Sequence, residues 1–347
     1  MAMTIVESHA VTGGVDTHLD IHVAAALDEI GGLLGVEEFP TTPVGYEALL
    51  AWLSSLGSVV LVGVEGTGSY GSGLTRYLQS SEVSVVEVNR ADRQERRRQG
   101  KSDPLDAISA ARAAQSGRAR ALPKGADGQV EAIRTLLVAK RSARKDKASA
   151  INQLRCVVAT GPDDLRELFG HHTIAALVRE TAALRPRTGD TVGHATRVTL
   201  RELGRRAKYL GDEMAHLDEL IVPLVAKRGA GLLALFGVGP DTAATLLVAA
   251  GDHPERLRSE AAWAQLCGVA PIPASSGKIV RHRLNPAGDR QANHALWRIV
   301  FVRMRSDPRT QAYVKRRSTE GKSKPEIMRC LKRYVAREVY PYLRGID

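Results

Sequence analysis

Two carboxylates, Asp103 and Asp106, stand three residues apart in the segment Gly100–Ala114, which reads GKSDPLDAISAARAA. A helix is predicted to begin here, because Ser102 is suited to an N-cap and Pro104 is tolerated in a first turn. Residues three apart share a helix face, so both carboxylates would project together. Aspartates that only complement the helix dipole are the alternative for this segment taken alone.

Two further acids, Asp16 and Glu65, stand at the ends of apolar runs. Asp16 follows VTGGV and Glu65 follows SVVLVGV, and both runs are predicted to form buried strands. An acid that ends a buried strand is costly unless it is paired or bound to a cation. Four acids that converge on one site would bind a hard cation such as Mg²⁺ through oxygen. The alternative is that each acid only caps a loop.

The 347 residues are enough for two or three domains. No apolar run is long enough to span a membrane, and the start MAMTIVESHA lacks the layout of a signal peptide. We therefore expect a cytoplasmic, nucleoid-associated protein without membrane contact. Cys156, Cys267 and Cys330 are far apart and show no CxxC or Cys/His spacing, which argues against disulfides and structural zinc.

The net charge of +11 is concentrated at the C-terminal end. Residues 278–347 hold 18 Lys and Arg against 6 Asp and Glu, whereas the rest of the chain holds 31 against 32. This pattern is typical of a protein that binds phosphate backbones, although a solvated helical surface is the alternative. A second basic segment, 90–101, directly precedes Asp103. The candidate nucleic-acid-binding residues are Arg93, Arg96, Arg97, Arg98, Lys101, Lys278, Arg281, Arg283, Arg290 and Arg298.

Residues 11–89 alternate apolar runs with turn signals. Two opening strands joined around Thr17–Asp20, helices near Gly45–Leu56 and Ser72–Ser80, and the runs SVVLVGVEG and VSVVEVN predict a mixed α/β sheet covered by helices. A polar stretch at Val36–Thr42 separates the opening strands from the first helix. Residues 1–125 are predicted to be one domain.

The chain is predicted to be helical from about residue 127. Residues 126–228 are predicted to form helical arms, because one apolar stripe follows a heptad spacing that is typical of a coiled-coil seam. That seam could close within one chain or between two chains, and a plain core helix explains it equally well. Pro223 is expected to end or bend the helix. The stripe consists of Leu200, Leu203, Ala207, Leu210, Met214, Leu217 and Ile221.

Residues 229–347 are predicted to form a mostly helical C-terminal domain. The segment FGVGPDTAATLL is similar to a helix-hairpin-helix, in which a helix N-terminus presents N–H groups to a phosphate. The loop PIPASSGK holds Ser275 and Ser276 among the cations Lys278, Arg281 and Arg283. A serine alkoxide placed there could attack phosphorus while cations stabilise the anionic transition state.

Six segments in this order resemble one known family. GVDTH, VEGTGSYG, KSDPLDA, FGVGPDTA, CGVAPIPASSGK and GDRQANHALWRIV are similar to transposases of the bridge-RNA-guided insertion-sequence family one-ten, DEDD type. The resemblance covers nearly the whole chain. It departs from the family at Gly288-Asp289, where a Gly-Asn pair is usual, so the roles of Asp289 and the downstream Asn293 stay open.

The resemblance implies a RuvC-like, RNase H-type N-terminal domain in which Asp16, Glu65, Asp103 and Asp106 bind Mg²⁺ or Mn²⁺. It implies that Ser276, the serine directly before glycine, is the nucleophile and forms a covalent phosphoserine link to DNA. The partners implied are donor and target DNA, a structured guide RNA encoded beside the gene, and further copies of the chain, as a dimer or a tetramer.

The resulting interpretation is an RNA-guided DNA recombinase of an insertion sequence. The first alternative is a metal-dependent nuclease of the Holliday-junction type, which uses the same acids but lets water attack. The second is a nucleic-acid-binding protein without catalysis. The recombinase would form covalent protein–DNA adducts, whereas the hydrolytic nuclease would not. DNA products that depend on Mg²⁺ are expected of both enzymes but not of the non-catalytic protein.

Overall fold

The computed structural model describes residues 9–88, 102–123, 128–186, 190–252, 257–274 and 282–344. The chain divides into two compact units, residues 1–126 and residues 127–347. Each unit is described by itself.

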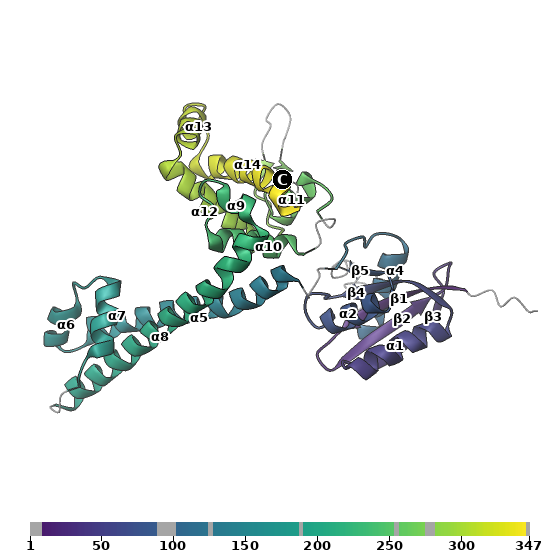
Figure 1. The fold of residues 1–347 in the computed structure, drawn as a ribbon, viewed down its shortest axis with the longest axis horizontal. Helices are drawn as coiled ribbons and strands as arrows, with labels where there is room; N and C mark the ends of the chain where they lie inside the picture. Colours follow the sequence, from purple (N-terminus) through teal and green to yellow (C-terminus); the bar gives the residue numbers. More distant parts are fainter. Residues whose placement is uncertain are drawn as a thin grey trace, which may run out of the picture. The chain divides into compact units, whose positions relative to one another are not determined.

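The first unit is built on a five-stranded mixed sheet with the strand order β3-β2-β1-β4-β5 (Figure 1). The strands β1, β2 and β3 are antiparallel, whereas β4 runs parallel to β1 and β5 runs parallel to β4. This confirms the predicted α/β fold, its mixed sheet and its opening strand pair. The elements are β1 (Ala10–Thr17), β2 (Ile21–Leu27), β3 (Leu33–Pro40), α1 (Pro43–Ser55), β4 (Ser58–Glu65), α2 (Ser72–Ser80), β5 (Val85–Val88) and α4 (Asp103–Gln115).

The polar stretch that begins at Val36 is part of strand β3 rather than a linker. The strand lies at the edge of the sheet and pairs only with β2, and most of its side chains are exposed. An edge strand of this kind needs no regular apolar alternation, which is why the sequence pattern did not identify it.

The two faces of the sheet are covered by different helices. Side chains alternate along a strand, so Val11, Val15, Val62 and Val64 pack with α1 and α2 on one face. On the other face Ala107 of α4 packs against residues of β2. The residues of β1 and β4 that alternate with these valines therefore face α4.

The second unit is helical apart from the two-residue strands β6 and β7, which pair with each other. Its elements are α5 (Gln129–Thr160), α6 (Asp163–Phe169), α7 (Ile174–Ala183), α8 (Thr191–Arg228), α9 (Ala230–Ala234), α10 (Pro240–Ala250), α11 (Glu260–Leu266), β6 (Ile272–Pro273), β7 (His282–Arg283), α12 (Arg290–Ser306), α13 (Pro308–Thr319) and α14 (Lys324–Arg344).

The long helices α5 and α8 lie side by side within one chain (Figure 1). Five positions of the apolar stripe of α8 are buried, namely Leu200, Ala207, Leu210, Leu217 and Ile221. The helix does not end at Pro223 but continues to Arg228. A proline removes one backbone donor, and here the packing of Ile221 and Val225 in the core holds the helix on both sides of it. Whether the stripe also joins two chains as a coiled coil stays a prediction.

One hydrophobic core joins the arms to the C-terminal helices. Ile133 of α5 and Ile221 of α8 belong to the same buried cluster as Leu246, Trp263 and Ile299. The two predicted domains 126–228 and 229–347 thus share a core, and a domain boundary at residue 228 stays a prediction.

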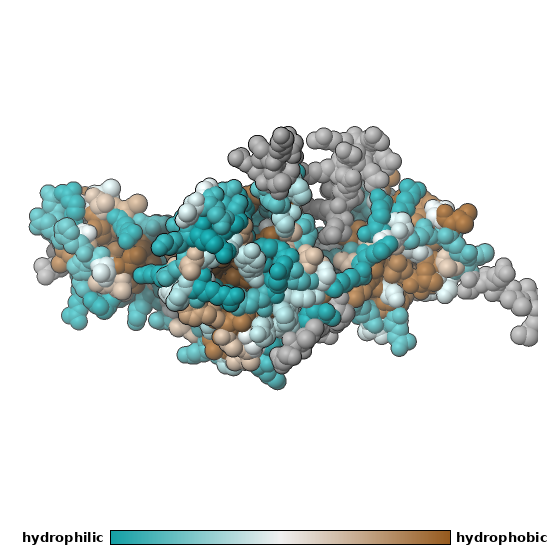
Figure 2. All heavy atoms as spheres, turned by 90° about the horizontal axis from the view of Figure 1, so that it is seen from above, coloured by the Kyte–Doolittle hydropathy of each residue, from teal (hydrophilic) through white to brown (hydrophobic). Residues whose placement is uncertain are grey.

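In the part of the chain that the structure describes, no helix combines the length and the apolar character needed to cross a membrane. The face of the molecule in Figure 2 is covered mainly by hydrophilic residues, with smaller hydrophobic patches among them.

Candidate metal centre and nucleic-acid interface

Asp16 and Glu65 lie at the same end of two neighbouring parallel strands. Val15 of β1 is aligned with Val64 of β4, so the next residue of each strand is one of the two acids. Both acids alternate with core valines that face α1 and α2, and they therefore belong to the face that α4 covers. The register of the sheet brings two distant parts of the sequence to one edge.

Helix α4 carries the other two acids onto this face. It begins at Asp103 with Ser102 as N-cap and Asp103 and Asp106 in its first turn, as predicted, although the Ser102 side chain makes no capping hydrogen bond. The helix crosses β1 at Gly14, where a Cβ atom would lie 2.1 Å from the backbone nitrogen of Ala111. Only glycine permits this close approach, which fixes the first turn of α4 beside the end of β1.

The geometry brings Asp16, His18 and Asp103 together. The Nε2 atom of His18 lies 3.1 Å from Oδ2 of Asp16 and 3.5 Å from Oδ1 of Asp103. One ligand atom of each of these three residues lies within 4.8 Å of the others, so the group could hold a metal ion. Asp16 and Asp103 thus lie close together, and their role as metal ligands stays a prediction.

Asp16 is buried, and its environment is negatively charged. Burial raises the pKa of its carboxyl group, the nearby charges of Asp106 and Asp103 raise it further, and His18 partly offsets these effects. Asp106 is also buried. Two aspartates whose charges act on Asp16 form a site at which a cation relieves repulsion.

Glu65 lies outside the compact group formed by Asp16, His18 and Asp103. Its backbone is held at the site, since its carbonyl oxygen accepts a hydrogen bond of 2.8 Å from Oγ1 of Thr17. Gly66 follows with a φ of 68°, a left-handed conformation that turns the chain directly after the strand. The strand register therefore places Glu65 beside the end of β1, on the sheet face that α4 covers. Its convergence with the three aspartates on one metal site stays a prediction.

The donor set fits a hard divalent cation. Carboxylate oxygens are the ligands that Mg²⁺ and Mn²⁺ prefer, and the imidazole of His18 now lies between the two carboxylates. His18 is the one member of the group that the sequence analysis did not single out. It is two residues after Asp16, and a period of two along extended chain could have indicated that both point to the same side.

Comparison with known proteins identifies a family for this chain. A family model described as "Transposase", of the IS110 DEDD type, matches residues 13–160, and a second model described as "Transposase IS116/IS110/IS902 family" matches residues 230–315. The chain belongs to the IS110 transposase family. The first of these matches contains all four acids.

Two curated relatives are similar to parts of the chain. A protein of insertion element IS900 from Mycobacterium paratuberculosis is 26% identical over 203 residues, which are 53% of this chain and 50% of the relative. A protein of insertion element IS110 from Streptomyces coelicolor is 32% identical over 114 residues, 33% of this chain and 28% of the relative. The matched segments thus span about half of the first relative and less than a third of the second.

The second IS110-family match contains the predicted nucleophile. Residues 275–281 lie outside the described residues, as do 89–101. The structure therefore does not place Ser276, nor the predicted contacts Arg93, Arg96, Arg97, Arg98, Lys101, Lys278 and Arg281. The strands that flank the serine segment are described, and Pro273 of β6 pairs with His282 of β7.

Three of the predicted nucleic-acid-binding residues in this IS110-type region lie within the residues that the structure describes. Arg283 is exposed in β7, and Arg290 is exposed in the first turn of α12. Arg298, also on α12, lies 3.8 Å from a carboxylate oxygen of Asp241. Arg283 and Arg290 are thus placed to meet a polyanion, whereas Arg298 already neighbours a carboxylate.

The residues at the departure from the IS110 pattern have structural partners. Asp289 caps α12 by accepting hydrogen bonds from the backbone of Gln291 and Ala292. Asn293 donates to the carbonyl oxygens of Cys267 and Gly268, and it accepts a hydrogen bond of 2.8 Å from Nζ of Lys332. Both residues hold the turn after α11 against the start of α12.

The predicted hairpin of two helices is present as α9, a turn with Gly237 at a φ of 81°, and α10. The side chain of Asp241, in the first turn of α10, binds Lys140 and Arg144 of α5. Lys140 is buried and also binds Asp218 of α8. This network ties three helices together, and phosphate binding at the turn stays a prediction.

Helix α12 carries an exposed aromatic stack. The ring centroids of His294 and Trp297 are 5.6 Å apart, and those of Trp297 and Phe301 are 5.2 Å apart. Trp297 and Phe301 are exposed. Aromatic side chains beside cations are typical of surfaces on which nucleic-acid bases stack.

Proposed function

We propose that this protein is a DNA recombinase of an insertion sequence, which cleaves and exchanges DNA strands under the guidance of an RNA. The observation that carries the proposal is the approach of Asp103 to Asp16 across the face of the sheet, with Asp106 close enough to act on the same carboxylate. The family matches at both ends of the chain and the basic C-terminal region support it.

The acids of the first unit would hold Mg²⁺ or Mn²⁺. Asp16, Asp103 and Asp106 would supply oxygen ligands from one face, with Glu65 at the adjacent strand end. When bound, the metal polarises a phosphate and offsets the charge that develops in phosphoryl transfer.

Ser276 would carry out the chemical step. Its hydroxyl oxygen forms a bond to phosphorus while the bond from phosphorus to the leaving sugar oxygen breaks, and the serine proton ends on that oxygen. The DNA strand is then joined to the protein through a phosphodiester that a second strand can attack. Cations beside the serine in the sequence would stabilise the anionic transition state.

A guide RNA would supply the specificity. The aromatic stack of α12, Arg283 and Arg290 are exposed, and they would contact nucleic acid without reading its sequence. Base pairing between RNA and DNA would then select donor and target, as in other guided systems. Assembly into a dimer or tetramer through the helical arms is part of this proposal, and light scattering measures it.

The decisive experiment incubates the chain with RNA from its flanking region, Mg²⁺ and matching donor and target duplexes. A denaturing gel then detects DNA strands joined to protein. We expect the adduct in the wild type and in Ser275→Ala, its loss in Ser276→Ala, and its loss in Asp103→Asn. Cleavage without an adduct, unchanged in Ser276→Ala, would support the hydrolytic nuclease instead. Binding without any cleavage, insensitive to Asp103→Asn, would support the non-catalytic protein.

A further inference from the structure

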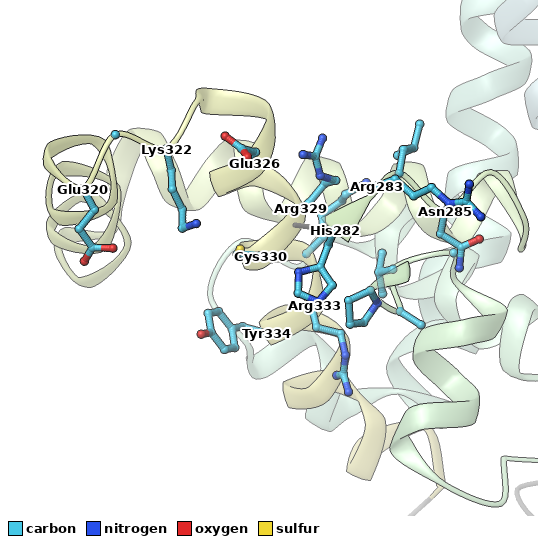
Figure 3. Close-up of a pocket in the computed structure, with 17 residues that line it drawn as sticks. His282, Arg283, Asn285, Glu320, Lys322, Glu326, Arg329, Cys330, Arg333 and Tyr334 are labelled. Carbon is cyan, nitrogen blue, oxygen red and sulfur yellow. The ribbon is translucent and has the colours of Figure 1, made fainter. Parts of the chain in front are cut away.

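A cavity of about 500 Å³ opens in the second unit beside β7, the end of α13 and the start of α14 (Figure 3). This volume is within the range of pockets that hold one small ligand. Its wall is rich in basic side chains, which are His282, Arg283, Lys322, Arg329, Lys332 and Arg333.

The two acids of the cavity wall are already engaged. Glu320 pairs with Arg317, and Glu326 accepts hydrogen bonds from the backbone nitrogen and the hydroxyl of Ser323. In the described part of the chain, Arg283 and Arg329 form no ion pair. The charge of Glu326 also acts on Lys322 and Arg329, but the basic side chains of the wall outnumber its two acids, so the cavity carries net positive charge.

Asn285 adds an unsatisfied donor to this wall. The residue is 8% exposed, and its Oδ1 atom accepts a hydrogen bond of 3.0 Å from the backbone nitrogen of Ala287. Its Nδ2 atom is buried and has no hydrogen-bond partner among the described residues. A buried donor without a partner is energetically costly, so an acceptor on a ligand would be stabilised here.

Lys332 places a further charge in the wall. The residue is buried, and its Nζ atom donates a hydrogen bond to Oδ1 of Asn293. Burial lowers the pKa of Lys332, and the positive charge of Arg329 lowers it further. An anion between the two side chains would relieve this repulsion.

Tyr334 provides an aromatic surface at the same cavity. Its ring meets the ring of Tyr313 edge to face, with centroids 5.8 Å apart, and the residue is 51% exposed. A ring held in this way by a neighbour can stack on a nucleobase at small entropic cost.

The cavity adjoins the strands that flank the serine segment. Pro271, directly before β6, and Arg283 of β7 both line it, and Pro273 and His282 of those strands are paired. Ser276 is three residues beyond Pro273 in the sequence. Residues that line the cavity therefore stand within a few positions of the predicted nucleophile in the sequence.

We propose that this cavity binds one nucleotide of a DNA strand, with its phosphate between Arg283, Arg329 and the amide of Asn285 and its base against Tyr334. The base would leave the stack of its neighbours to enter, as it does in enzymes that extrude nucleotides from a duplex. The assignment to DNA rests on the proposed function. The binding of a nucleotide is argued independently of it, from the positive charge, the unpaired amide and the aromatic ring of the cavity.

Binding of a free nucleotide to the full chain tests the inference without metal or RNA. The probe is 2-aminopurine deoxyriboside 5′-monophosphate, whose fluorescence falls on stacking. We expect saturable quenching, at least tenfold weaker binding of the deoxynucleoside without phosphate, and weak competition by inorganic phosphate. Equal binding of the nucleoside would overturn the phosphate contacts, and tighter binding of the ribonucleotide would overturn the assignment to DNA.

Two variants probe the anion contacts, and the first of them is isosteric. Asn285→Asp keeps the acceptor for Ala287 and replaces the unpaired donor with a negative charge, so we expect at least a tenfold loss of nucleotide affinity. Arg329→Gln is expected to lower the nucleotide affinity about tenfold. Arg337→Gln, on the same helix but outside the cavity wall, is the matched control and should bind normally. Unchanged affinity in both cavity variants, with wild-type melting temperatures, would overturn the proposal.

The aromatic contact has its own control. Tyr334→Leu should abolish the quenching, whereas Tyr209→Leu, an exposed tyrosine of α8, should preserve it. Nucleotide binding without DNA cleavage would thus refute the proposed function alone, and cleavage with cavity variants that bind normally would refute this inference alone.

Discussion

The Nε2 atom of His18, directly after β1, lies 3.5 Å from Oδ1 of Asp103, the first residue of α4. The contact exists because α4 passes over Gly14 at the distance of a backbone contact. The contact joins the end of β1 to the first turn of α4, where the carboxylates of Asp16, Asp103 and Asp106 lie. Metal affinity at this contact and the free energy of unfolding can be measured separately.

Metal binding should depend on the carboxylates more than on the imidazole. We expect Asp16→Asn and Asp103→Asn to weaken Mn²⁺ binding more than about 100-fold and His18→Ala to weaken it about tenfold or less, because hard cations prefer oxygen. Electron paramagnetic resonance of free Mn²⁺ measures the affinities. A loss in His18→Ala as large as in Asp103→Asn would show instead that the imidazole is a principal ligand.

The crossing of α4 and β1 should not tolerate a side chain at Gly14. A Cβ there would lie 2.4 Å from the carbonyl oxygen of Ala107, so Gly14→Ala must displace the helix. We expect a loss of about 1–3 kcal/mol in the free energy of unfolding and weaker Mn²⁺ binding. Gly68→Ala, with nothing within 4 Å of its Cβ, is the control for urea denaturation. Equal stability of both variants would contradict this account of the crossing.

Removal of Lys140 should destabilise the second unit. Lys140 is buried and binds both Asp218 and Asp241, so Lys140→Met leaves two carboxylates without their shared partner. We expect the free energy of unfolding to fall by about 3 kcal/mol. This is near the lower end of the cost of removing one partner from a buried ion pair, because both aspartates are partly exposed. Lys145→Met, on the exposed side of the same helix, should change the urea midpoint little. A stabilised Lys140→Met protein would show that apolar packing outweighs the network.

The same network should make stability depend on acid pH. Burial raises the pKa of Asp241, but hydrogen bonds from Lys140 and Arg144 outweigh it and hold the pKa below its usual range. A lowered carboxyl pKa contributes stability above the unfolded-state value of about 4, and this stability is lost as the pH falls through the folded-state pKa. Urea midpoints from pH 7 to pH 2.5 should therefore fall less steeply below pH 4 in Asp241→Asn than in the wild type. Parallel curves would argue against a role for this carboxylate.

Binding to duplex DNA should depend on salt through the exposed arginines of the C-terminal region. Arg290 forms no ion pair among the described residues, so Arg290→Gln is expected to lower the slope of log affinity against log salt by about 0.9. Arg179→Gln, whose arginine already pairs with Glu180, should leave the slope unchanged. Fluorescence anisotropy at several salt concentrations measures both, and an unchanged slope in Arg290→Gln would exclude it from the interface.

Local signals in the sequence were sufficient for the elements that carry the acids. Apolar runs ending in Asp16 and Glu65, and the segment with Ser102 as N-cap, predicted two strands and a helix that the structure confirms. Such signals are local because burial of a strand and the start of a helix depend on adjacent residues. Strand β3 was missed because an edge strand with exposed side chains has no such pattern.

The sequence by itself determined which residue types could do chemistry and on which elements they stand. Only the tertiary structure decided which of them meet: His18 joined the site, Glu65 stayed outside its compact group, and Lys140 became the buried centre of an ion network. These outcomes depend on strand register and on how closely helices pack. Both arise from contacts between residues far apart in the chain, which no local pattern records.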